Sequence, residues 1–108
     1  MANTAAIGFN FRAIGDLIFS SSTLDVASLL DAAGATSTVT VVGAALGDFV
    51  PFVSLSVDIQ SITVTAWVSA ANVVSVRFQN EAAATIDLAS ATLRLVVVKA
   101  NGQVWKNL

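Results

Sequence analysis

Hydrophobic and polar residues alternate along most of this sequence. Apolar residues occupy every second position over residues 53–59, 62–68, 74–78 and 93–97, and mostly polar residues stand between them. The same alternation is found in shorter form at residues 7–12, 24–26 and 38–41. Because side chains of a β-strand point alternately to opposite faces, each stretch predicts a strand with one buried face. The abundance of Val, Ile and Thr favours the same interpretation.

Turn-forming residues separate the predicted strands at intervals of about 10 residues. They include Gly34, Asn72, Asn80 and the Asn101–Gly102 pair. This spacing predicts an all-β fold, an antiparallel β-sandwich that is jelly-roll-like and has about six to eight strands. For "LDVASLLDAAGA", residues 24–35, a short helix or a turn is the alternative to a strand, whereas "NEAAATIDLAS", residues 80–90, is expected to be a loop.

The segment "VVGAALGDFVPF", Val41 to Phe52, predicts a strand, a turn bounded by glycines and a second strand. A phosphate-binding loop is excluded because no Lys-Ser or Lys-Thr follows the glycines and a strand pattern comes next. Asp48 is expected to accept hydrogen bonds from turn amides. Pro51 cannot donate to a β-ladder, so it marks a strand start, an edge strand or a bulge. Phe49 and Phe52 are expected to re-enter packed surface.

The composition indicates that part of the outer surface is covered by other protein. The chain of 108 residues is 56% hydrophobic and 11% charged, with a mean hydropathy of +0.80, whereas soluble domains are about 25% charged. The last predicted strand becomes apolar on both faces at Val96–Val98, and a second subunit is expected to cover the outer face; the alternative is a central sandwich strand beneath a loop. The candidate interface residues are Phe49, Phe52, Trp67, Val96, Val98 and Trp105.

Candidate chemistry is sparse. The sequence has no His, Cys or Tyr, so the commonest general base, two nucleophiles and the usual zinc ligands are missing. No spacing makes two carboxylates converge, and no calcium-loop pattern is present. We therefore expect no enzyme activity, catalytic residue, cofactor or metal site. The basic residues are scattered, which argues against a nucleic-acid partner, and no stretch predicts a membrane span or signal peptide.

Trp67 is the one candidate ligand platform. It falls on the polar-facing side of its predicted strand, opposite Val64, Ala66 and Val68. An exposed aromatic ring there can contact another protein or stack on a sugar. If the strand register is shifted by one residue, Trp67 belongs to the core instead. These three alternatives remain open from the sequence.

Most of the chain, from about Leu24 to Val98, resembles a small β-domain of tailed-bacteriophage virion proteins. That domain occurs in capsid decoration (cement) proteins and at the ends of fibre and knob proteins. Four motifs carry the resemblance: G-A-A-L-G-D at Gly43–Asp48, V-S-A-A-N at Val68–Asn72, the V-x-V-R-F-x-N strand, which ends with Val76–Asn80, and D-L-A-S at Asp87–Ser90. The resemblance implies a non-enzymatic structural protein that forms a homo-oligomer, most often a trimer, and it implies no catalytic residue.

From the resemblance we expect a decoration protein on the capsid surface of the virion, made in the cytoplasm of the bacterial host. Its partners would be other copies of itself and the phage major capsid protein, whose assembled shell it would stabilise. The alternative is a receptor- or carbohydrate-binding module of a knob or fibre tip. Residues 21–108 are expected to form the β-sandwich domain, and residues 1–20, outside the resemblance, an arm or an extra strand.

Overall fold

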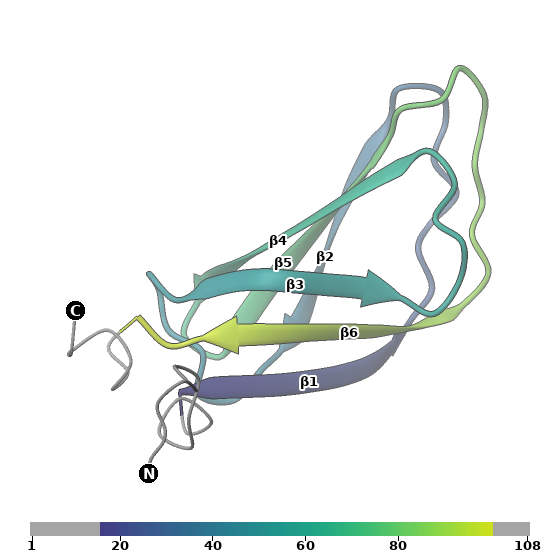
Figure 1. Cartoon of the computed structure of the whole chain (residues 1–108). Helices are drawn as coiled ribbons and strands as arrows, with labels where there is room; N and C mark the ends of the chain where they lie inside the picture. The colour runs from purple at the N-terminus through teal and green to yellow at the C-terminus, as the bar shows by residue number, and fades with distance from the viewer. Residues whose placement is uncertain (1–15, 101–108) are drawn as a thin grey trace, which may run out of the picture.

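The computed structural model of the chain describes residues 16–100 (Figure 1). The predicted strand at residues 7–12, the Asn101–Gly102 turn and Trp105 lie outside the described residues, as does most of the expected N-terminal arm. The described residues form six β-strands and no helix, which confirms the all-β prediction. The strands are β1 (Leu17–Leu24), β2 (Gly34–Thr40), β3 (Phe49–Leu55), β4 (Ile62–Ala70), β5 (Val73–Asn80) and β6 (Ala91–Val98).

The six strands form two antiparallel sheets of three strands each. Sheet I has the order β1-β6-β3, and sheet II has the order β2-β5-β4. Only β4 and β5 are joined as a hairpin within one sheet, through the two residues Ala71 and Asn72. Asn72 adopts a positive φ of 64°, a conformation that Asn tolerates better than most residues. Every other connection carries the chain from one sheet to the other.

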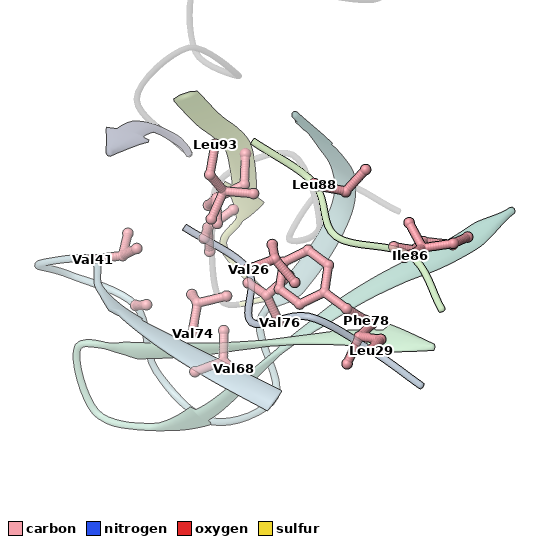
Figure 2. Packing of buried hydrophobic residues seen from close by; sticks show 14 residues of the cluster. Val26, Leu29, Val41, Val68, Val74, Val76, Phe78, Ile86, Leu88 and Leu93 are labelled. Carbon is pink, nitrogen blue, oxygen red and sulfur yellow. The ribbon is translucent and has the colours of Figure 1, made fainter. Parts of the chain in front are cut away.

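The core of residues 16–100 lies between the two sheets (Figure 2), and the central strands β5 and β6 together contribute six buried residues to it, as do the connections. Val74, Val76 and Phe78 of β5 are fully buried, and so is Val97 of β6. These residues are the apolar members of the alternating stretches, so the predicted inward faces of β5 and β6 are confirmed. Burying each such side chain contributes about 1.5–3 kcal/mol to folding.

The alternation misses most of β1, which spans Leu17–Leu24 and meets the strand predicted at residues 24–26 only at Leu24. Val26 is buried, but it lies in the connection that follows. β3 ends at Leu55, although the alternation continues to residue 59. After Leu24, residues 25–33 form a connection in which Leu29 pairs with Ile86. A turn follows, closed by a 2.9 Å hydrogen bond from the amide of Ala33 to the carbonyl of Leu30. Of the alternatives for this stretch, the turn is therefore the one found.

A buried asparagine explains why this connection is not helical. Asn80 is 1% exposed, and its Nδ2 donates to the carbonyls of Leu29 (3.1 Å), Leu30 (3.1 Å) and Ala84 (2.8 Å). In a helix, those first two carbonyls would accept bonds from amides four residues later. Here the carbonyls of Leu29 and Leu30 accept hydrogen bonds from the Asn80 side chain, and the Leu29 carbonyl also accepts one from the Ile86 amide. Oδ1 of Asn80 accepts a 2.8 Å bond from the Ala82 amide. Asn80 thus fixes both long loops, including the predicted loop at residues 80–90.

The connections gather at two opposite ends of the molecule (Figure 1). One end, the terminal end, holds residues 41–48 and 71–72 together with the start of β1 and the end of β6. The other, the loop end, holds the three remaining connections at residues 25–33, 56–61 and 81–90. The two sheets therefore present their outward faces between these ends.

Candidate interaction surface

The outward face of sheet I carries six apolar side chains, and we call it the aromatic face. One row across the sheet joins Phe19 of β1, Val96 of β6 and Phe52 of β3. The next row joins Leu17, Val98 and Phe49 in the same order of strands. Phe19 is 71% exposed, Phe52 66% and Phe49 49%. Large aromatic side chains so exposed, side by side on one face, are typical of a surface that another protein covers.

A bulge in β3 brings two of these aromatic rings to the same face. Phe49 and Phe52 are three positions apart, so a regular strand would point them to opposite faces. The pairing of β3 with β6 shifts between them, and Phe49 lies opposite Val98 while Phe52 lies opposite Val96. Pro51 stands within this shift, on an edge strand of sheet I. The prediction of an edge strand or bulge at Pro51 is confirmed.

A shallow groove of about 610 Å³ crosses the aromatic face. Its apolar part is lined by Phe19, Pro51, Phe52 and Val96. Its polar part continues one row further, where Arg94 lies between Ser21 and Ser54 on the neighbouring strands. The groove therefore offers apolar area beside a single guanidinium group surrounded by hydroxyls.

The outward face of sheet II differs in kind, and we call it the hydroxyl face. The outward residues here are mostly Thr and Ser, and the longer polar side chains bind one another. Arg77 donates to Oγ1 of Thr36 (3.3 Å) and to Oε1 of Gln79 (3.2 Å), and Gln79 donates to the carbonyl of Ala32 (2.8 Å). Gly34 makes room for them, since an added Cβ would clash with the side chains of Arg77 and Gln79. The longer polar side chains of this face are therefore hydrogen-bonded within the chain.

Trp67 lies on the hydroxyl face and is 45% exposed. It pairs across the sheet with Ser75, while Val64 and Val68 of the same strand face the core. The interpretation of Trp67 as a core residue is therefore wrong, because the register of β4 points it outward. Of the other candidate interface residues, Phe49 and Phe52 are exposed, Val96 and Val98 are half-buried on the aromatic face, and Trp105 lies outside the described residues.

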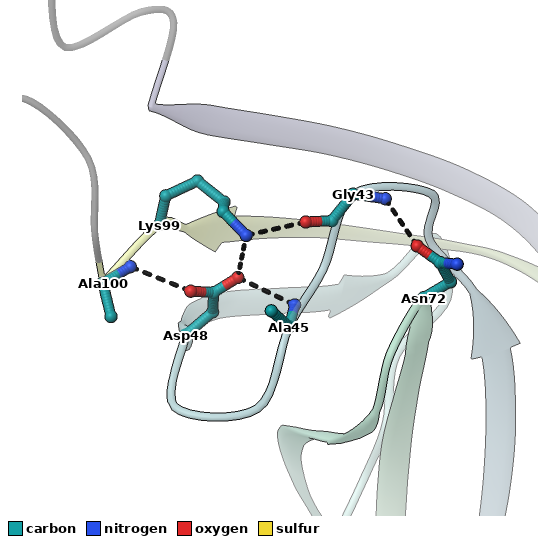
Figure 3. Close-up of polar contacts among 6 residues, drawn as sticks. All are labelled: Gly43, Ala45, Asp48, Asn72, Lys99 and Ala100. Carbon is teal, nitrogen blue, oxygen red and sulfur yellow. Dashed lines mark hydrogen bonds and ion pairs between the residues drawn. The ribbon is translucent and has the colours of Figure 1, made fainter.

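Asp48 closes the turn predicted at residues 43–48 and ties it to the end of β6 (Figure 3). Its Oδ2 accepts hydrogen bonds from the Ala45 amide (2.9 Å) and from Nζ of Lys99 (2.5 Å), and its Oδ1 accepts one from the Ala100 amide (2.9 Å). Nζ of Lys99 also donates to the carbonyl of Gly43 (2.7 Å). The prediction that Asp48 accepts bonds from turn amides is confirmed, and the turn requires a φ of +99° at Gly43.

The environment of Asp48 keeps its carboxyl group ionised. The side chain is 3% exposed, and burial alone raises its pKa. The hydrogen bonds from Lys99, Ala100 and Ala45, together with the charge of Lys99, outweigh burial and hold the pKa of Asp48 below its ordinary value. A carboxylate held this way is a structural anchor, not a group poised to exchange protons near neutral pH.

The remaining acidic residues are not arranged for metal binding. Among residues 16–100, no group of three or more His, Cys, Asp or Glu side chains is placed to hold an ion. The same residues contain no helix of the length and apolar character needed to cross a membrane.

Two members of this surface escape a reading of the sequence alone. Phe19 follows Leu17 and Ile18 in "LIFSSSTL", so no polar–apolar alternation marks it as outward, and only the strand pairing places it beside Val96 and Phe52. In the sequence, Arg94 is one of several scattered basic residues. Only the pairing of β6 with β1 and β3 places it between Ser21 and Ser54. A comparison with known protein families and a search among curated proteins both find no match to this chain.

Proposed function

We propose that this protein is a structural component of a bacteriophage virion, a capsid decoration or cement protein rather than an enzyme. It would associate with itself, as a homotrimer, and bind the assembled shell of the major capsid protein at the capsid surface. The observation that carries the self-association is the exposed aromatic face. The resemblance of Gly43–Asp48 and the later motifs to phage virion domains supports the phage assignment.

The aromatic face supports a permanent rather than a transient contact. The exposed rings of Phe19, Phe49 and Phe52 leave apolar surface in contact with water. Association would bury this surface, and the transfer free energy gained is about 25 cal/mol per Å² of apolar area. Clusters of aromatic residues are characteristic of interface cores, from which most charged residues are depleted. Among the outward residues of β1, β3 and β6, Arg94 is the one charged residue.

The mechanism we propose is reinforcement by mass action. A protein that binds the assembled shell, but not its free subunits, stabilises assembly by RT ln(1 + [L]/Kd). This role needs a rigid body and contact surfaces, and it needs no reactive group. The buried, paired state of Asp48 and the absence of His, Cys and Tyr from the sequence are consistent with it.

We also propose that the two sheets form a sandwich of jelly-roll type. A jelly roll of about eight strands is built from two Greek keys. Its sheets run first-eighth-third-sixth and second-seventh-fourth-fifth; leaving out the fifth and sixth strands and renumbering yields the orders β1-β6-β3 and β2-β5-β4. The hairpin between β4 and β5 stands where those two strands would be inserted. An experimental structure with a different strand order would contradict this proposal.

Solution mass tests the self-association. Light scattering of the full chain across a dilution series should give three times the monomer mass of 11.1 kDa. Co-sedimentation with assembled shells, compared with unassembled capsid subunits, then tests the decoration role. A monomer at every concentration contradicts the trimer, and equal binding to shells and free subunits contradicts the reinforcement mechanism.

A second candidate, a receptor- or carbohydrate-binding module, is favoured by Trp67. Its ring is half-exposed among the hydroxyl side chains of sheet II, an environment in which a sugar can stack and hydrogen-bond. Glycan-array binding that is lost in a Trp67→Ala variant would favour this role. Shell binding that survives Trp67→Ala, with no glycan bound by either form, would favour decoration.

A further inference from the structure

The aromatic face holds a positive charge without a counter-charge. Arg94 is exposed, and no carboxylate stands among the outward residues of β1, β3 and β6. Two copies joined through this same face would bring two guanidinium groups to one interface with nothing to neutralise them. Burying an unpaired charge is costly, so the face is better matched by a partner surface that supplies a carboxylate.

The exposed carboxylates of this chain are concentrated at the loop end. The three loops there contain five acidic residues and no Lys or Arg. All five are exposed: Asp25, Asp31, Asp58, Glu81 and Asp87. At the terminal end, by contrast, Asp48 is already bound to Lys99. The loop end of another copy can therefore supply the charge that the aromatic face lacks.

One of these acids stands beside a large exposed apolar side chain. Leu30, which precedes Asp31, is 67% exposed, whereas Val26, Ile86 and Leu88 beside other loop-end acids are buried. The Leu30–Asp31 pair also projects from a fixed turn. The Ala33 amide donates to the carbonyl of Leu30, and Nδ2 of Asn80 donates to the same carbonyl. A rigid projection loses little conformational entropy on binding.

We propose that the Leu30–Asp31 turn of one copy docks in the groove of the aromatic face of a second copy. Leu30 would pack on Phe19, Phe52 and Val96, and Asp31 would pair with Arg94. Successive outward residues on a strand, such as Arg94 and Val96, are separated by about 6.6 Å, a spacing that adjacent Leu and Asp side chains can match.

This contact joins two different surfaces, the Leu30–Asp31 turn and the groove of the aromatic face. Each copy carries both surfaces and can therefore bind two neighbours. Contacts of this kind close into a ring when the rotation between copies allows it and otherwise continue as a filament. A closed ring of three is the form that agrees with the proposed trimer. The inference rests on the self-association part of the proposed function and names the partner surface for it.

Charge exchange between the two positions tests the contact. We expect Arg94→Glu and Asp31→Arg each to weaken association of the full chain about tenfold or more, and the double variant to return to within about threefold of the wild type. Asp87→Arg, an exposed acid of the same end, is the matched control and should leave association unchanged. The dissociation constant comes from sedimentation velocity over a dilution series, and circular dichroism checks that each variant folds.

The outcomes separate this inference from the proposed function. If the single variants associate as the wild type does, or the double variant fails to recover, the Leu30–Asp31 contact is wrong. If association is then lost on replacing Phe19 and Phe52, the aromatic face still mediates self-association through another partner surface. A wild-type chain that is monomeric at every concentration would overturn both.

Discussion

The aromatic face and the hydroxyl face come from sheets of the same size, with strands of seven to nine residues and the same alternation. On the hydroxyl face, Arg77 and Gln79 bind neighbours within the chain, and Gly34 leaves space for them. On the aromatic face, the rings of Phe19 and Phe52 and the guanidinium of Arg94 face solvent. The longer polar side chains of the hydroxyl face are thus hydrogen-bonded within the chain, whereas the aromatic face exposes rings and a guanidinium group.

The difference shows that the alternating pattern sets which side of a strand is buried but not the role of the other side. Both sheets bury inward side chains completely: Phe78 of sheet II and Val97 of sheet I are each fully buried. Burial in the core does not constrain the outward residues, and here they form a polar network on sheet II and an apolar patch on sheet I. Substitutions on the two faces should therefore affect different measurable properties.

The largest expected effect follows from removing the rings of the aromatic face. Phe19→Ser combined with Phe52→Ser should weaken self-association at least about a hundredfold, because each central aromatic residue of an interface contributes about 2 kcal/mol or more. Monomer stability should change little, since both side chains are mostly exposed. The dissociation constant from sedimentation velocity measures the effect. Leu46→Ser, at an equally exposed apolar residue outside the face, is the control, and an equal loss there would contradict a specific surface.

The second prediction concerns the anchor between the terminal-end turn and β6. Asp48→Asn should lower the free energy of unfolding by about 2 kcal/mol, because it leaves the Lys99 ammonium and one backbone amide poorly paired in a buried site. Urea unfolding measures this loss. Because the change lies outside both faces, the association of the folded variant should stay unchanged.

The same residue predicts a pH dependence. The pKa of Asp48 is lower in the folded chain than its ordinary value, so its contribution is fully present above the ordinary value and is lost as the pH falls through the lowered one. The wild type should lose stability over that acidic range more steeply than Asp48→Asn. Identical pH profiles of the two proteins would contradict the assignment of Asp48 as an ionised anchor.

Much of the fold follows from the sequence, and what does not is a matter of pairing. Period-two alternation locates β3 to β6 and the second half of β2 but not β1, and local chemistry explains the turn at Gly43 and the edge position of Pro51. The order β1-β6-β3, however, places next to each other strands that are far apart in the chain. The Asp48–Lys99 pair spans 51 positions. Such contacts depend on tertiary packing, which local periodicity does not reveal.

The aromatic face illustrates this limit more closely. Phe49 and Phe52 are visible as apolar residues near a turn, but the bulge that points both outward is a feature of pairing with β6. Val57 and Ile59 continue the alternation although β3 has ended at Leu55. Asn80, which resembles a simple turn residue, is a buried donor to three carbonyls in two loops. Side-chain hydrogen bonds over such distances leave no periodic signal.

A smaller effect is expected from disturbing the hydroxyl face. Gly34→Ala should lower the free energy of unfolding by about 1 kcal/mol, because the added Cβ displaces the side chains of Arg77 and Gln79 and breaks their hydrogen bonds. Thermal unfolding followed by circular dichroism measures the change. Self-association should be unaffected. A loss of association larger than the loss of stability would mean that the polar network also holds a partner.

The smallest effect is expected at Trp67, which makes it the sharpest test of whether the two faces are separate. Trp67→Thr extends the Thr pattern of β4 and should change the free energy of unfolding by about 1 kcal/mol or less, because the ring is half-exposed. The dissociation constant of the oligomer should stay within about twofold, since the aromatic face is untouched. Sedimentation velocity and urea unfolding on one protein preparation give both values. A tenfold weaker oligomer with unchanged stability would place Trp67 in the interface and extend the contact surface onto sheet II.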